Sequence, residues 1–315
     1  MKKLILAFAA FALSMGMMSA QDLATATETY NKGAEAYATS NYTSALDYFK
    51  KALEMAQALG ADGEEVAGNC KNAIPSVILS IGKELYNNKD FDGAVAKITE
   101  AGKVAEEYGN ADVAAQVKEL LPQVTVTKTM DQANDAFKAK NIAGALALYK
   151  EVMAADTANG IAALRIGQIL GSTGKLNEAV SYLEIAKRNG QEANATTILS
   201  TSFLKQAAGM LKAGKYADAI TLAEKANSYK VNPQAFLIAG QAAQKSGKDN
   251  IAIENFDKYL SASPNAKNAG AIAFTVGALY QKAGNKAKAV EYYKKVLTDP
   301  QFGVQAKQLV ESLSK

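Results

Sequence analysis

The sequence of 315 residues has no histidine and no tryptophan, and it contains one cysteine and five prolines. Without histidine the chain has no imidazole base, no histidine-dependent catalytic triad and no zinc site with histidine ligands. The GxGxxG, GxxxxGK[ST] and GxSxG motifs are absent, as is the spacing of a calcium-binding loop. The sequence therefore predicts no catalytic residues, no cofactor, no metal and a protein that is not an enzyme.

Arginine is scarce, because only Arg165 and Arg188 among the 35 basic residues are arginines. Lysine is a poor substitute where phosphate is bound in a planar, bidentate way, so we expect no nucleic-acid partner. Residues 21–157 carry 13 Lys against 20 Asp and Glu, net −7, whereas residues 158–315 carry 20 Lys and Arg against 11, net +9. This asymmetry reflects either ordinary solvated helix faces or a field that steers a partner.

The single cysteine, Cys70, cannot form a disulfide within the chain. It lies at helical three-and-four spacing with Val66, Ile74 and Val77, which predicts a small buried residue. A reactive thiol or one that pairs between chains is the alternative, although no CxxC partner is present.

The first twenty residues have the layout of a secretory signal peptide. Lys2 and Lys3 precede an apolar run over residues 4–13, and small residues and methionines lead to Ala20. We predict cleavage after Ala20, with an uncleaved anchor as the alternative, and no lipid modification because no cysteine follows the run. The mature chain has no stretch long enough to span a membrane. We expect an exported protein, periplasmic or else associated with the outer membrane or secreted.

A repeated pattern extends over the rest of the chain. Seven alanines are each followed, one helical turn later, by a large residue in all copies except the fifth, where Ala223 stands instead. Twelve residues before each alanine lies a glycine or an alanine. These marks are Gly33 with Ala45, Gly82 with Ala94, Ala133 with Ala145, Gly167 with Ala179, Ala207 with Ala219, Gly240 with Ala252 and Gly277 with Ala289.

Between the two marks lie turn sequences such as "TSNYTSA", "KAGKYADA" and "KSGKDNIA". Gly, Asn and Asp suit left-handed or capping positions, so each copy reads as two amphipathic helices joined by a tight turn. GK pairs at Gly174, Gly214 and Gly247 fall in these turns, and we attribute their lysines to the favourable end of a helix dipole. Such pairs must stack on their neighbours to bury their apolar faces.

The pattern resembles the tetratricopeptide repeat, most clearly in "FTVGALYQKAGNKAKAVEYYKKVLTDP", residues 274–300, and in residues 236–264 and 164–186. The opening tryptophan is missing everywhere, and the closing proline is present only in the last two copies. The resemblance implies an all-α fold, a right-handed superhelical solenoid of antiparallel helix pairs, about seven in number, with a C-terminal end helix.

Spacing divides the chain into residues 21–157, with extended or kinked helices, and residues 158–315, with regular repeats. The first two intervals between marked alanines are 49 and 51 residues, against a norm near 34. We expect the excess to be additional helix with a kink or break at Pro75 and Pro122.

The resemblance also implies a surface of first helices that takes an extended peptide or a partner helix. Aligned on the marks, the tentative partner-binding residues are Lys212, Lys245, Lys282, Gln241, Gln244, Gln281, Leu211, Gln168 and Lys138. A row of lysines could bind carboxylates, so the partner could be acidic, although lysine is also ordinary near a helix C-terminus.

Two functions stay open at this point. The first is an exported, non-enzymatic scaffold that binds a protein or peptide in the bacterial cell envelope during assembly, transport or surface organisation. The alternative is a structural homo-oligomer in which the acidic N-terminal half and the basic C-terminal half of the chains pair.

Overall fold

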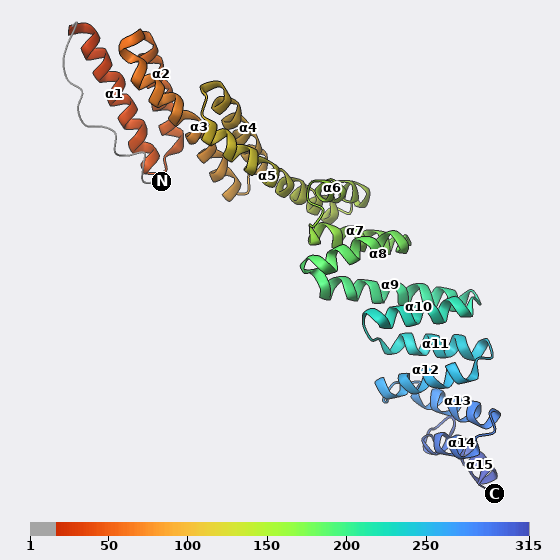
Figure 1. The fold of residues 1–315 in the computed structure, drawn as a ribbon. Helices are drawn as coiled ribbons and strands as arrows, with labels where there is room; N and C mark the ends of the chain where they lie inside the picture. Colours follow the sequence, from red (N-terminus) through yellow and green to blue (C-terminus); the bar gives the residue numbers. More distant parts are fainter. Residues whose placement is uncertain (1–16, 315) are drawn as a thin grey trace. The chain divides into compact units, whose positions relative to one another are not determined.

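The computed structural model describes residues 17–314, which are all-α (Figure 1). The first helices of successive pairs are α1 (Met17–Ala38), α3 (Glu64–Asn87), α5 (Ala111–Lys138), α7 (Gly160–Ser172), α9 (Glu192–Lys212), α11 (Pro233–Lys245) and α13 (Ala269–Lys282). The second helices are α2 (Tyr42–Ala58), α4 (Phe91–Tyr108), α6 (Ile142–Ala155), α8 (Leu176–Ala186), α10 (Tyr216–Tyr229), α12 (Asp249–Ala262) and α14 (Lys286–Lys294). The predicted all-α solenoid of sequential helix pairs is confirmed, as is the end helix, α15 (Gly303–Leu313).

The described residues form two compact units. The N-terminal unit ends at Asp135 and the C-terminal unit begins at Ala136, so the boundary falls inside α5. The division at residue 157, which concerned charge and repeat regularity, stays a prediction. The predicted signal peptide lies mostly outside the described residues, and only Met17–Ala20 belong to α1.

The expected additional helix in the N-terminal part is confirmed. The helices α3 and α5 have 24 and 28 residues, whereas α7, α11 and α13 have 13 or 14. Both long helices continue through their prolines, Pro75 and Pro122, so neither proline breaks its helix. A short 3-10 turn, η1 (Gly60–Gly63), precedes α3, and a kink, η2 (Lys187–Gln191), joins α8 to α9 because Asn189 and Gly190 leave the helical conformation.

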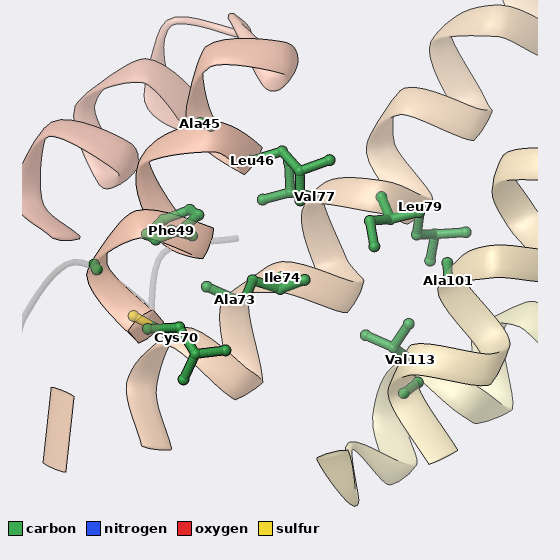
Figure 2. Packing of buried hydrophobic residues seen from close by; sticks show 14 of the residues in the cluster. Ala45, Leu46, Phe49, Cys70, Ala73, Ile74, Val77, Leu79, Ala101 and Val113 are labelled. Carbon is green, nitrogen blue, oxygen red and sulfur yellow. The ribbon is translucent and has the colours of Figure 1, made fainter. Parts of the chain in front are cut away.

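Packing in the N-terminal unit follows the helical period of its apolar residues. In α2 the buried residues are Ala45, Leu46, Phe49, Ala52, Leu53 and Ala56, which lie on one face of the helix. Figure 2 shows Leu46 beside Val77, and Phe49 close to Cys70 and Ala73 of α3. The predicted burial of Cys70 is confirmed, because its exposed fraction is 0%.

The marked small residues let the two helices of a pair approach closely. A Cβ atom placed on Gly33 would lie 2.9 Å from the Phe49 ring, and one on Gly240 would lie 2.6 Å from the Phe256 ring. In the fifth copy both sides change together, since the small mark is Ala207 and the large residue is replaced by Ala223, and both are buried.

Candidate partner-binding surface

The first helices of the C-terminal unit form the surface on which the predicted binding residues lie. The helix α9 contacts α7 on one side and α11 on the other, although a second helix separates each of these pairs in sequence. This arrangement follows from stacking, because each helix pair buries an apolar face that it cannot cover alone. Residues at equivalent positions of α7, α9 and α11 therefore line one continuous surface.

The three predicted lysines are the last residues of their helices, Lys212 of α9, Lys245 of α11 and Lys282 of α13. All are exposed, and their charges lie at helix C-termini, where the macrodipole favours them. They are not equivalent, because Lys282 Nζ lies 2.6 Å from Asp249 Oδ2, at the first residue of α12. Lys212 and Lys245 have no such partner within residues 17–314, so their charges face solvent.

Two of the four predicted glutamines accept hydrogen bonds from other side chains. Gln281 Oε1 accepts a hydrogen bond from the Tyr293 hydroxyl at 2.8 Å, and Gln168 Oε1 accepts one from Arg165 Nη1 at 3.0 Å. The Gln241 and Gln244 side chains make no hydrogen bond within the part of the chain that the structure describes. Their amides can therefore donate to and accept from a ligand backbone.

Five of the nine predicted residues thus come together on two neighbouring helices, free to bind. They are Leu211, Lys212, Gln241, Gln244 and Lys245, which we call the α9/α11 surface. Leu211 is half-buried against the core, so it adds an apolar rim. Lys138 lies apart from this surface, as the exposed last residue of α5.

Sequence reasoning missed Arg165, whose guanidinium lies 5.3 Å from the centre of the Phe137 ring. This cation–π contact and the hydrogen bond to Gln168 hold the arginine along the first-helix surface. One of only two arginines in the chain was a signal that could have drawn attention to it.

The lysines of the GK pairs lie in the inter-helix turns, where each donates its backbone amide to the last turn of the preceding helix and also begins the next helix. Lys175, Lys215 and Lys248 are the N-caps of α8, α10 and α12, and none of these N-caps makes a side-chain capping bond. A positive charge at a helix N-terminus is unfavourable, and Asn, Asp or Ser is preferred there. Each lysine follows a left-handed glycine, so it lies just beyond the helix end that the sequence analysis assigned to it.

Within residues 17–314 no group of three Cys, Asp or Glu side chains is placed to hold a metal ion. Over the same residues no helix combines the length and the apolar character that a membrane span requires.

Comparison with known proteins supports the repeat assignment. The family model described as tetratricopeptide repeat matches residues 272–298, which cover most of α13 and all of α14. The matched segment corresponds to one helix pair of the C-terminal unit. No curated protein matches the chain.

Several solved structures are similar to this chain. The crystal structure of MamA protein is 25% identical, with a TM-score of 0.36, over 55% of this chain and 91% of that chain. A structure titled MamA AMB-1 is 21% identical, with a TM-score of 0.36, over 60% and 93% of the two chains. YrrB, described as a TPR protein with an unusual peptide-binding site, is 20% identical, with a TM-score of 0.33, over 57% and 90%.

Proposed function

We propose that this protein is an exported, non-enzymatic scaffold that binds a protein or peptide on the α9/α11 surface. One observation carries the proposal, namely that two neighbouring first helices present lysines and amides without partners beside a half-buried leucine. The tetratricopeptide repeat in the same unit supports a scaffold role for this surface.

The chemistry of this surface favours an extended segment with carboxylates. Lys212 and Lys245 offer six N–H donors in total, and charge-assisted hydrogen bonds to carboxylates are stronger than neutral ones. Gln241 and Gln244 can bind the backbone of the segment from α11, whereas Leu211 contacts an apolar side chain. The surface has no counter-charge of its own at Lys212 and Lys245, so an acidic partner supplies it.

Site-specific photo-crosslinking in the native host tests the proposal. A benzophenone amino acid is placed at Gln241 in one strain and at Asn250 in another, because Asn250 is an exposed amide on the second helix α12. We expect a discrete crosslinked protein from position 241 that Lys212→Glu together with Lys245→Glu abolishes. Equal crosslinking from both positions, or crosslinking that survives the double substitution, would contradict the α9/α11 surface.

Export to the bacterial cell envelope is a second part of the proposal, supported by the sequence of residues 1–20. N-terminal sequencing of the protein recovered from the envelope fraction should begin at Gln21. Recovery of the intact N-terminus would favour the uncleaved anchor, and recovery from the cytoplasm would contradict export.

Self-association is the second candidate function, and the charges of the two units favour it. Residues 17–135 carry 10 Lys against 18 Asp and Glu, net −8, and residues 136–314 carry 22 Lys and Arg against 13, net +9. Two bodies of opposite charge attract at low ionic strength. Copies of this chain can therefore pair the acidic unit of one with the basic unit of another.

A further inference from the structure

The seven turns within the helix pairs share one hydrogen-bond pattern. In the α11/α12 turn the Gly247 amide donates to the Gln244 carbonyl at 3.1 Å, and the Lys248 amide donates to the Ala243 carbonyl at 2.8 Å. The equivalent two bonds recur in every one of the other six turns. The backbone geometry is therefore the same throughout, and the side chains at the turns are free to vary.

The residue after the left-handed position varies in a way that local stability does not explain. Asn41, Asp90, Asn141 and Asn285 cap the next helix by accepting a hydrogen bond from a backbone amide. Lysine occupies the same position in the α7/α8, α9/α10 and α11/α12 turns, and no side-chain cap forms there. Lysine is unfavourable at a helix N-terminus, so its repeated use there points to a role outside the helix.

These lysines lie on one edge of the C-terminal unit. Figure 1 shows the α9/α10, α11/α12 and α13/α14 turns along the same side of the stacked helices. We call Lys212, Lys215, Lys245, Lys248 and Lys286 the basic turn edge. All five are exposed, and none has an acidic partner within residues 17–314. The three turn segments, residues 212–218, 245–249 and 282–286, contain six Lys and two Asp, a net charge of +4.

The N-terminal unit carries the complementary charges on its loops between pairs. Three carboxylates lie in η1 and the first turn of α3, and three lie in the last turn of α4 and the first turn of α5. We call these residues the acidic loops, and they are Asp62, Glu64, Glu65, Glu106, Glu107 and Asp112. All six are exposed, and none has a basic partner within residues 17–314. The two segments, residues 60–65 and 106–112, contain no lysine or arginine, so their combined net charge is −6.

We propose that the basic turn edge of one copy binds the acidic loops of a second copy. The inference rests on the self-association candidate and names the two surfaces that perform it. Because the two surfaces differ, the contact is heterologous, and each copy keeps one unsatisfied surface of each kind. Association therefore continues head to tail into open chains unless a ring closes.

Sedimentation velocity of the mature chain tests the proposal across a range of protein concentrations. We expect concentration-dependent oligomers at about 20 mM salt that dissociate at about 500 mM, because exposed charge pairs are screened. The variant Lys215→Glu, Lys248→Glu, Lys286→Glu should weaken association about tenfold or more. Glutamate is favoured near a helix N-terminus, so the variant should keep its helical circular dichroism.

A matched control carries the same charge change elsewhere in the C-terminal unit. Lys205→Glu, Lys267→Glu and Lys307→Glu alter exposed lysines outside the basic turn edge, and this variant should associate nearly as the natural chain does. Equal loss of association in both variants would mean that net charge alone is responsible, and it would overturn the assignment of the edge.

The most stringent test reverses the charges of both surfaces in two separate variants. The variant Asp62→Lys, Glu65→Lys, Glu107→Lys should be monomeric alone, as should the basic-edge variant. Mixed together, the two should associate, because each now presents a surface that complements the other. Failure of the mixture to associate overturns the proposal.

Two outcomes separate this inference from the binding of a different partner. A natural chain that is monomeric at every concentration in low salt overturns the proposal. If that monomer binds vesicles of phosphatidylglycerol through the basic turn edge, the occupant is an anionic membrane instead of a second copy. Because Lys212 and Lys245 belong to both surfaces, the product crosslinked at Gln241 is identified by mass spectrometry. A different protein supports the proposed partner-binding function whatever the sedimentation result, whereas a crosslinked second copy of this chain supports self-association alone.

Discussion

The turns of the two units solve one geometric problem with different residues. In the α1/α2 and α3/α4 turns the left-handed positions hold Ser40 and Lys89, with φ of 61° and 63°. In the α9/α10 and α11/α12 turns they hold Gly214 and Gly247, each with φ of 73°. A residue with a Cβ is strained in this conformation, whereas glycine is not. The two turns of the N-terminal unit therefore carry a conformational cost that the glycine-containing turns of the C-terminal unit avoid, and the α5/α6 turn, with Lys140 at a φ of 61°, is the exception in the C-terminal unit.

The residue after the left-handed position, which is the N-cap of the next helix, favours the N-terminal turns instead. Asn41 and Asp90 follow the strained residues and cap the next helix, and Lys140 followed by Asn141 shows the same combination in the α5/α6 turn. Where lysine replaces the cap, the left-handed residue is always glycine. In these three turns the strain relieved by glycine offsets the missing cap, whereas the α13/α14 turn has both a left-handed Gly284 and a capping Asn285. The left-handed glycine therefore leaves the cap position free to carry a lysine.

The largest expected effect concerns packing, which both units share. Gly240→Ala should lower the free energy of unfolding by about 2 kcal/mol, because the added methyl group meets the buried Phe256 ring. Gly209→Ala in α9 is the matched control, since nothing lies within 4 Å of its added Cβ. There the better helix propensity of alanine should raise stability by about 0.5–1 kcal/mol. Urea unfolding followed by circular dichroism measures both, and equal shifts would contradict the packing rule.

The next largest change in stability is expected from substitutions of the N-cap residues. Asp90→Lys should cost about 1–2 kcal/mol, because the Asp90 carboxylate accepts a hydrogen bond from the Gly93 amide at 2.9 Å. Lys248→Asn should gain about 1 kcal/mol by restoring a cap to α12. Thermal unfolding should shift in opposite directions for the two variants. A destabilised Lys248→Asn protein would mean that the lysine stabilises the turn, which removes the premise of the basic turn edge.

The left-handed residues should show a somewhat smaller, reciprocal effect. Lys89→Gly relieves the strain at a φ of 63° and should stabilise the chain by about 1 kcal/mol, less the flexibility that glycine adds to the unfolded chain. Gly247→Lys introduces the strain and should cost about 1 kcal/mol. Urea midpoints compare the pair, and Ser40→Gly serves as the second N-terminal test. Stabilisation by Gly247→Lys would break the comparison between the units.

The sequence predicted the helix pairs well because packing fixes them from both sides. A small residue such as Gly240 requires a large one such as Phe256 across the pair, and that relation is visible at fixed spacing. The turns were less predictable, since Lys89 and Lys140 adopt a conformation that their residue type disfavours. A shift of one or two residues also decides whether a lysine ends one helix or caps the next.

The candidate surface could be predicted only in part, because contacts between helix pairs depend on how far one pair is displaced along the next. The pairing of Lys282 with Asp249 is such a contact, and it leaves Lys282 unlike Lys212 and Lys245 although the three share a repeat position. Asp249 is the first residue of α12, the helix that precedes α13. The corresponding first residue is Tyr216 of α10 for Lys245 and Leu176 of α8 for Lys212, and neither can neutralise a lysine. The repeat position therefore predicts where the three lysines lie, whereas the neighbouring side chains determine which of them lack an acidic partner.

The smallest effect at neutral pH belongs to Cys70, which lies in the long helix α3 of the N-terminal unit. Burial raises the pKa of the Cys70 thiol from 9.0 to about 12. The unfolded chain therefore loses this proton near pH 9 while the folded chain keeps it, so stability that is present below pH 9 is lost as the pH rises toward 12. Cys70→Ala should remove this dependence.

The measurement is the difference in urea midpoint between the natural chain and Cys70→Ala from pH 7 to pH 10.5. Other groups titrate alike in both proteins, so the difference isolates the thiol, and the natural chain should lose about 1 kcal/mol relative to the variant by pH 10. At pH 8 the folded thiol should also resist iodoacetamide until urea unfolds the N-terminal unit, because the reactive species is the thiolate. A pH-independent difference with rapid alkylation of the folded chain would show that Cys70 is accessible, and the alternative of a thiol that pairs between chains would then gain support.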